Sequence, residues 1–425
     1  MSDMTAYPAD YAATPVIEPP RSGFFFGPNG LRAGWGLLMF ALLLGMVFMV
    51  INLVVQIGAL MHPDAHHHAG SALYQPRTQI AESLLYMLTV IASAIMLAGR
   101  GAFAAGKAAL AVLLLVASCG FLTASVVHFN RVQKMLAAEQ QPGQPANATP
   151  VAQPAANAQI QQGKAIESEA LTFGVVLLVT WLMSRIEHRR FSEYGLGGNR
   201  RRWPQLGQGA LVGFGALSVL ILFLYLGHWI TFGGALLHSP GAVLENGFLW
   251  LVAFILVGFF EEFFFRGYLQ YTLARGIGLG AIGFFIAAAL FNFGFGFGHG
   301  NNPGESPIGL WTAGLIGFVF CISLWYTRSL WWAIGFHATW DWGESYFYGT
   351  ADSGGVSQGR LFDTHPQGTL LMSGGPTGPE GSALCLMVIV LIALFIWMTL
   401  RREHNKSTNQ ALINPLDSPQ TEPVA

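Results

Sequence analysis

The chain has 425 residues, of which 53% are hydrophobic and only 10% carry a charge. A soluble globular domain carries about 25% charged residues, so most of this chain is expected to lie in lipid. The formal net charge is −1, and the sequence has no basic stripe that could follow a phosphate backbone, so no nucleic-acid partner is expected. The three cysteines lie singly in apolar runs, without the spacing of a metal site or a disulfide framework, and are interpreted as small core residues.

Apolar runs of the length that crosses a hydrocarbon core recur along the chain, and each is expected to form a helix. They predict an all-α, polytopic transmembrane helix bundle of about ten spans. The spans lie near residues 34–60, 80–99, 108–128, 169–184, 207–227, 247–270, 279–298, 308–327, 329–347 and 381–400.

Basic residues alternate with these runs in a way that orients the bundle. Arginine and lysine gather before the first span and after the second, fourth, sixth, eighth and tenth, most densely at residues 185–202. Because cytoplasmic loops carry the excess of positive charge, both termini are predicted to be cytoplasmic. The expected location is a cell membrane, inner or plasma, that the chain crosses many times.

Polar stretches divide the chain into eight predicted parts. Residues 136–166 are rich in Ala, Gln and Pro and predict a disordered, non-cytoplasmic loop, and residues 348–380 form a second loop rich in Gly, Ser and Pro. The other parts are a disordered tail at 1–30, a three-span region at 31–135, the fourth span with a basic loop at 167–204, a membrane core at 205–347, the last span at 381–402 and a disordered tail at 403–425.

The sixth span carries two adjacent acids, Glu261 and Glu262, within a run of phenylalanines. Ionisable side chains inside membrane helices are costly and by default mark a functional site. Glu262 and Arg266 are four residues apart, so they share a helical face and can pair. Glu261 points about 100° away and lacks that partner, which suits a general acid or base. The alternative is that both acids dock neighbouring helices or line an ion path.

The seventh and ninth spans carry the other polar groups of the core. Asn292 and His299 are seven residues apart on one face of the seventh span, and His337 and Asp341 are four apart in the ninth. A helix rises about 1.5 Å per residue, which would place His299 near the far surface from Glu261. For the two to meet, the segment after Arg266 is expected to continue as a helix to about residue 275 or beyond.

On these residues the sequence resembles the CPBP family of intramembrane proteases, which includes the CAAX prenyl endopeptidases and bacteriocin-processing relatives. The family motifs read here as Glu261-Glu262-x-x-x-Arg266, Phe295-x-x-x-His299 and His337-x-x-x-Asp341. Each motif is weak alone, but the three occur in order and inside apolar helices. The resemblance covers roughly residues 205–347.

The resemblance implies an intramembrane endopeptidase acting on membrane-associated proteins or peptides, which could include prenylated CAAX proteins. Glu261 and His299 would activate a water for attack on a peptide carbonyl. His337 and Asp341 would stabilise the oxyanion, with support from Glu262, Arg266 and Asn292. Prenyl-protease members generally carry Asn at the last position. An aspartate donates a hydrogen bond only when protonated, so Asp341 could instead orient His337.

Three questions stay open at the level of the sequence. Glu261, His299 and His337 resemble the ligand set of a zinc protease, so a divalent metal such as zinc could take part, although the chemistry does not require one. The same residues could serve a transporter coupled to protons or cations through Glu261. A catalytically silent membrane scaffold or immunity protein is the third alternative.

Overall fold

The structure, a computed structural model, describes residues 23–27, 30–61, 76–98, 107–123, 158–198, 201–302 and 304–413. They divide into two compact units, which are described separately. The first comprises Met1–Val151, Gly174–Phe191 and Arg275–Ala281, and the second Ala152–Phe173, Ser192–Ala274 and Ile282–Ala425. The disorder predicted for residues 1–22, 136–157 and 414–425 lies outside the described residues.

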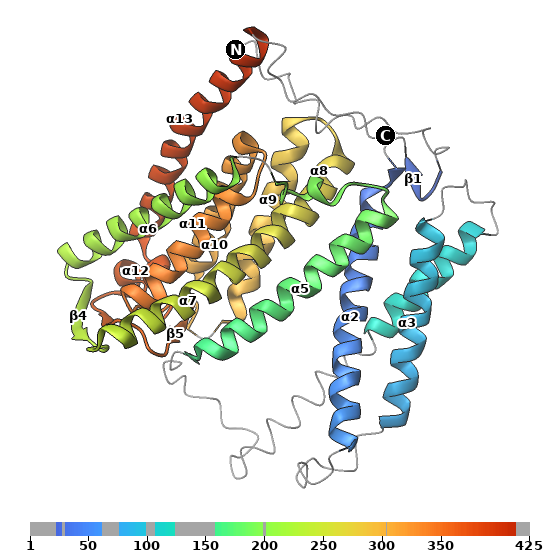
Figure 1. The fold of residues 1–425 in the computed structure, drawn as a ribbon, viewed down its shortest axis with the longest axis horizontal. Coiled ribbons are helices and arrows are strands. Elements are labelled where there is room, and N and C mark those ends of the chain that lie inside the picture. The colour runs from blue at the N-terminus through green and yellow to red at the C-terminus, as the bar shows by residue number, and fades with distance from the viewer. Residues whose placement is uncertain are drawn as a thin grey trace. The chain divides into compact units, whose positions relative to one another are not determined.

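The first unit is built on long apolar helices. Helix α2 (Ala33–Met61) packs beside α3 (Pro76–Ala98), and the buried hydroxyl of Tyr86 donates to the carbonyl of Leu42 at 2.7 Å (Figure 1). A further apolar helix covers Lys107–Thr123. Strands β1 (Phe26–Gly27) and β2 (Gly30–Leu31) form a small antiparallel pair at the end of the tail predicted to be disordered, residues 1–30. The ring of Trp35 packs on the neighbouring rings of Phe24 and Phe25.

The second unit contains the membrane core, in which α6, α7, α10 and α11 lie side by side (Figure 1). Helix α11 contacts α6, α7 and α10, and α13 packs on α6 and α10. The elements of this unit and those shared with the first are α5 (Gln162–Ile186), η2 (Phe191–Tyr194), α6 (Arg202–Leu226), α7 (Pro240–Glu261), η3 (Glu262–Gln270), α8 (Tyr271–Ile277), α9 (Ala281–Gly298), η4 (His299–Asn301), α10 (Pro307–Thr327), α11 (Trp331–Asp341), η5 (Trp342–Phe347), α12 (Leu370–Ser373), η6 (Pro379–Gly381) and α13 (Ala383–Ile413).

Two of the core helices begin at the same local signal. Ser239 precedes Pro240 at the start of α7, and Ser306 precedes Pro307 at the start of α10. Each serine hydroxyl accepts a hydrogen bond from a backbone amide of the first turn, and each proline occupies the first helical position, where its missing N–H costs nothing. Helix α7 therefore begins seven residues before the predicted start of the sixth span.

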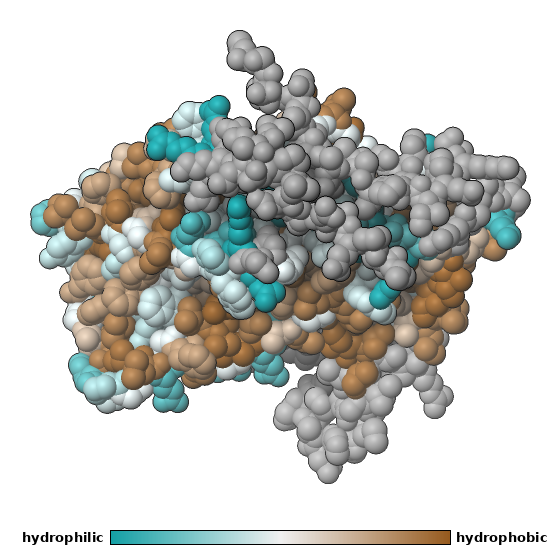
Figure 2. All heavy atoms as spheres, turned by 45° about the horizontal axis from the view of Figure 1, so that its top comes forward, coloured by the Kyte–Doolittle hydropathy of each residue, from teal (hydrophilic) through white to brown (hydrophobic). Residues whose placement is uncertain are grey.

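Among the residues that the structure describes, seven helices are long and apolar enough to cross a bilayer, which makes this a multi-pass membrane protein. The exposed surface carries many large apolar side chains, as expected for helices facing lipid (Figure 2); they include Leu211, Leu244, Phe248, Ile282 and Leu290. The predicted count of ten is not confirmed. Two further apolar segments, Ser83–Ala98 within α3 and Lys107–Thr123, are shorter, and α11 has only 11 residues. The predicted orientation of the termini stays a prediction.

Short strands complete an otherwise helical fold, where the sequence predicts helices alone. Strand β3 (Ala158–Ile160) pairs in parallel with β5 (Gly355–Ser357), and β4 (Ile230–Ala235) pairs antiparallel with β6 (Phe362–Pro366). These pairings give residues 348–380 a regular structure, because strands in distant segments satisfy the backbone hydrogen bonds of the loop. Two predicted boundaries also differ: α5 begins at Gln162, inside the predicted loop, and α13 continues to Ile413.

Glycines set the distance between α6 and α11. A Cβ at Gly209 would lie 1.9 Å from the carbonyl oxygen of Trp332, and one at Gly335 would lie 2.1 Å from that of Leu206. The contact is backbone against backbone, so no side chain can move aside to make room. Small residues at helix contacts allow this approach in membranes. The packing fixes α11, which carries His337 and Asp341.

Gly209→Val should therefore destabilise the core by at least about 2 kcal/mol, because the added side chain would force α6 and α11 apart. The measurement is the thermal unfolding midpoint of the purified protein in detergent. Gly215→Val is the control, since a Cβ at this position of the same helix has nothing within 4 Å. Equal midpoints for the two variants would contradict the role of this contact.

Candidate active site

The helix that carries the two adjacent acids changes its hydrogen-bond pattern between them. Glu261 is the last residue of α7, and Glu262 is the first residue of the π-helix η3. A π-helix closes its bonds over one more residue than an α-helix, so the side chains that follow are rotated relative to an α-helical course. Both acids reach His337, whereas an α-helix was expected to point Glu261 away from the contacts of Glu262.

Glu262 lies at the centre of a buried ion pair. Its Oε1 accepts from Nη1 of Arg266 at 3.1 Å, and the two side chains are 0% and 1% exposed. The pair expected from the four-residue spacing therefore forms. The guanidinium also lies over the rings of Phe295 and Phe320. Glu262 is thus fully enclosed, whereas the side chain of Glu261 keeps 20% of its surface exposed.

The ion pair continues into a buried chain of polar side chains. Nη2 of Arg266 donates to the side-chain oxygen of Asn292, whose Nδ2 lies 3.1 Å from Sγ of Cys321. That thiol donates in turn to Oε1 of Gln270 at 3.0 Å. A Cβ at Gly317 would lie 2.1 Å from the guanidinium, so only glycine leaves room there. The chain ties η3 to α9 and α10.

Sequence reasoning missed Cys321 and Gln270 as members of this chain. Cys321 was interpreted as a small core residue, and it is indeed fully buried. Gln270 lies four residues after Arg266. An amide inside an apolar helix needs a hydrogen-bond partner, so its position could have indicated a further member of the polar chain. The partner on α10 could not be found from spacing along one helix.

His337 on α11 lies among three carboxylates. Its Nδ1 is 2.9 Å from Oε1 of Glu262, and its Nε2 is 3.5 Å from Oε2 of Glu261 and 3.4 Å from Oδ2 of Asp341. Because a carboxylate only accepts, the short contact places a hydrogen on Nδ1. The ring of Phe320 packs on the imidazole at a centroid distance of 5.5 Å. The ring is therefore held on one edge by Glu262 and presents Nε2 to the two other acids.

His299 begins the short 3-10 helix η4 directly after α9. Its Nδ1 is 2.9 Å from the carbonyl oxygen of Phe295, and its ring packs edge-on against the ring of that residue. The carbonyl can only accept, so Nδ1 donates and a neutral ring carries its lone pair on Nε2. The Phe-x-x-x-His spacing thus acts within one helical turn to orient the imidazole.

A single cavity of about 390 Å³ connects these residues. Its wall includes Glu261, His299, His337 and Asp341, whereas Glu262, Arg266 and Asn292 lie behind it. Aromatic side chains form much of the remaining wall, among them Trp250, Phe254, Phe295, Phe320 and Trp340. The structure thus places the four predicted catalytic residues around one space, with the three predicted supporting residues outside it.

Further acids at this cavity were not singled out from the sequence. Glu169 from α5, Asp352 from the loop after η5, and Glu380 from η6 also line the wall. Burial and the neighbouring carboxylates of Asp341 and Glu380 raise the pKa of Asp352 well above its ordinary value. No lysine or arginine among the described residues lines the cavity. The space is therefore acidic.

The proposed metal ligands do not assemble. Among the described residues, one group of three acids or histidines has ligand atoms within 4.8 Å of one another: Glu344, Asp352 and Glu380. Glu261, His299 and His337 are not part of such a group. Zinc sites need ligand atoms about 2.0–2.2 Å from the ion and thus close together. The residues present do not fit a zinc centre in this arrangement.

Asn292→Ala should lower the free energy of unfolding by about 1–3 kcal/mol, because Arg266 would lose an acceptor in a buried site. Chemical or thermal unfolding in detergent measures the loss. The exposed Asn301→Ala is the matched control, since it removes the same group from a position in contact with solvent. A loss no larger than that of the control would mean that Asn292 does not stabilise the ion pair.

Searches of curated proteins and of solved structures give no significant match. One family model matches residues 244–343, described as "Type II CAAX prenyl endopeptidase Rce1-like". The matched stretch holds Glu261, Glu262, His299, His337 and Asp341, in agreement with the resemblance of the motifs. Residues 244–343 of this membrane protein are therefore an Rce1-like domain of the type II CAAX prenyl endopeptidase family.

Proposed function

We propose that the chain is an intramembrane endopeptidase that hydrolyses peptide bonds of membrane-associated proteins or peptides, with a water activated by Glu261. The observation that carries the proposal is the cavity shared by Glu261, His299, His337 and Asp341 in the membrane core. The family match supports endopeptidase activity, while the substrate and the roles of the residues are part of the proposal.

Glu261 is the proposed general base. It is the member of the acid pair that keeps exposed surface, and Glu262 is already engaged by Arg266 and His337. The carboxylate takes a proton from water, and the resulting hydroxide attacks the carbonyl carbon of the substrate. The C–N bond then breaks as the proton is delivered to the leaving amine, which restores Glu261.

His299 is the proposed partner of Glu261 at the water. Its Nδ1 is fixed by the carbonyl of Phe295, so Nε2 is the nitrogen available to accept a hydrogen bond from the water. Two acceptors can hold both hydrogens of one water and direct its lone pair to the substrate. This arrangement orients the nucleophile before attack, which lowers the entropic part of the barrier.

His337 is the proposed donor to the oxyanion. With Nδ1–H held by Glu262, a protonated Nε2 can donate to the oxygen on which charge develops. Asp341 lies 3.4 Å from Nε2 and acts in this proposal as a positioning residue that favours the protonated ring. The aspartate at the position where the family generally has Asn therefore need not donate to the oxyanion itself. No step requires a metal.

The test is a cleavage assay with the full chain reconstituted in liposomes. Farnesylated CAAX peptides and single-span membrane peptides are added, and mass spectrometry identifies any new C-terminus. We expect the wild type and Glu245→Gln, an exposed acid on α7, to give the same product. Absence of product from every substrate would contradict the proposal. Activity that survives a chelator would fit the mechanism, whereas loss restored by zinc would contradict it.

One observation favours a second function, a carrier coupled to protons or cations. The cavity wall holds five carboxylate side chains and no lysine or arginine among the described residues; the acids are Glu169, Glu261, Asp341, Asp352 and Glu380. An acid-lined space concentrates cations. The same liposomes separate the two functions: cation uptake that is lost in Glu261→Gln, without peptide cleavage by the wild type, would favour the carrier.

A further inference from the structure

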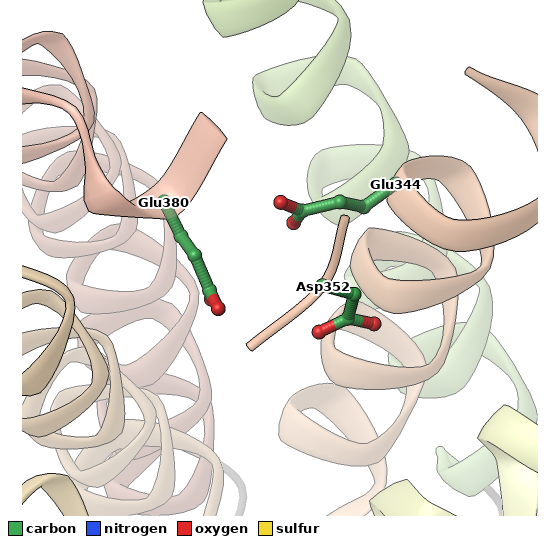
Figure 3. A group of neighbouring side chains, drawn as sticks. All are labelled: Glu344, Asp352 and Glu380. Carbon is green, nitrogen blue, oxygen red and sulfur yellow. The ribbon is translucent and has the colours of Figure 1, made fainter. Parts of the chain in front are cut away.

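A second group of acids lies beside the candidate catalytic residues, at the junction of three segments. Glu344 comes from η5, Asp352 from the loop that follows, and Glu380 from η6. One carboxylate oxygen of each lies within 4.8 Å of the others. Figure 3 shows Glu344 and Glu380 extending into the gap from opposite sides, with Asp352 beside it.

Glu344 is the buried member of the group, and its carboxylate has no hydrogen-bond partner among the described residues. It is 0% exposed, and neither of its carboxylate oxygens accepts a hydrogen bond from the described residues. The backbone amide of Glu380 faces the carboxylate, but the contact does not have the geometry of a regular hydrogen bond. An ionised buried carboxylate without a partner costs several kcal/mol, so such a group either takes up a proton or binds a counter-charge.

The two other acids are held in place by hydroxyl and amide donors. Oε1 of Glu380 accepts from both the amide and the hydroxyl of Ser353 at 2.7 Å. Oδ2 of Asp352 accepts from the hydroxyl of Ser345 at 2.8 Å. These bonds fix the positions of the two side chains and bring no positive charge to them. Within the described part of the chain, no ion pair joins any of the three acids to a basic side chain.

We propose that Glu344, Asp352 and Glu380 form a binding site for a hard divalent cation, Ca²⁺ in particular. Ca²⁺ binds carboxylate oxygens at 2.3–2.6 Å, so two of its ligands lie at most about 5 Å apart. The separation of the three oxygens agrees with that geometry. Mg²⁺ demands near-ideal octahedral geometry and usually keeps several waters, so a set of protein carboxylates suits Ca²⁺ better. The set contains no nitrogen or sulfur ligand that would favour zinc.

The position of the site gives the cation a structural task. The three ligands join η5 to the loop and to η6, which directly precedes α13. Asp352 and Glu380 also line the cavity, and Glu344 follows Asp341 on a continuous helical segment. A bound cation would therefore fix the loop that forms one wall of the cavity. This proposal does not depend on the peptidase activity, because it concerns binding and stability.

Direct binding of Ca²⁺ tests the site. The purified full chain in detergent is stripped with a chelator and dialysed against radioactive Ca²⁺, with Mg²⁺ and Mn²⁺ as competitors. We expect saturable binding in the range of ~1 mM or tighter, weakened at least ~10-fold by Glu344→Gln and by Glu380→Gln. Asp363→Asn is the control. The carboxylate of Asp363 lies in the same segment, residues 348–380, but pairs with Arg360 and is not part of the cluster. Its affinity should match that of the wild type.

Thermal unfolding of the same samples gives a second readout. Ca²⁺ should raise the unfolding midpoint of the wild type and of Asp363→Asn, and should leave that of Glu380→Gln unchanged. Glu380 is partly exposed, so this variant carries the test if Glu344→Gln fails to fold. The proposal would be overturned if the wild type bound no divalent cation. It would also be overturned if binding survived both substitutions unchanged, or if Glu344→Gln and Glu380→Gln raised stability without any cation effect in the wild type.

Discussion

Glu261→Gln is expected to reduce the rate of peptide cleavage by about 10²–10⁴-fold, because glutamine keeps the shape of the side chain but cannot take a proton from water. The unfolding midpoint should change little, since Glu261 is partly exposed and its contact with His337 is 3.5 Å long. Single-turnover cleavage in liposomes measures the rate, and circular dichroism in detergent monitors the fold.

Glu245→Gln is the matched control for this substitution. It removes one carboxylate from the same helix at an exposed position and should leave the rate at the wild-type value. A rate for Glu261→Gln within a few-fold of that control would remove Glu261 from the chemistry. The acid pair would then serve only to hold α7 and η3 against α11.

Arg266→Leu is expected to destabilise the protein by about 3–5 kcal/mol, because it leaves the buried carboxylate of Glu262 without its counter-charge. Both side chains are almost completely enclosed, so solvent cannot compensate. His337 contacts the same Glu262 oxygen, and its orientation should be disturbed as well. Unfolding in detergent measures the loss of stability, and the cleavage assay measures the effect on the site.

A double-mutant cycle separates this pair from its surroundings. Glu262→Gln and Arg266→Gln are compared singly and together, and the double variant should be more stable than the sum of the two losses predicts. Arg401→Gln, on the exposed surface of α13, is the control for loss of a guanidinium and should cost less than about 1 kcal/mol. Additive losses at positions 262 and 266 would contradict an energetic coupling between them.

The parts of the candidate site that could be predicted are those that depend on residue spacing within a single helix. The spacing of four residues anticipates the contacts between Glu262 and Arg266 and between His337 and Asp341, because such residues share a helical face. The helix was also expected to continue beyond Arg266, and it runs through η3 and α8 to Ile277. Apolar length likewise identified the segments that form the long helices.

Departures from regular helix geometry could not be read from the same patterns. The helix changes to a π-helix at Glu262, and both acids contact His337; composition specifies neither feature. A second π-helix, η5, follows Asp341 and carries Glu344. The proximity of Glu344 and Glu380 depends on a loop that contains paired strands, so no periodicity along the chain links the two residues.

The central claim is that Glu261 and His299 act on the same water, and the rates of a double-mutant set test it most directly. Single-turnover peptide cleavage is measured for the wild type, Glu261→Gln, His299→Gln and the double variant. Residues that act as a unit are strongly non-additive, so the double variant should be no slower than the slower single variant, within about a factor of three. Multiplicative losses, or full activity in either single variant, would contradict the account.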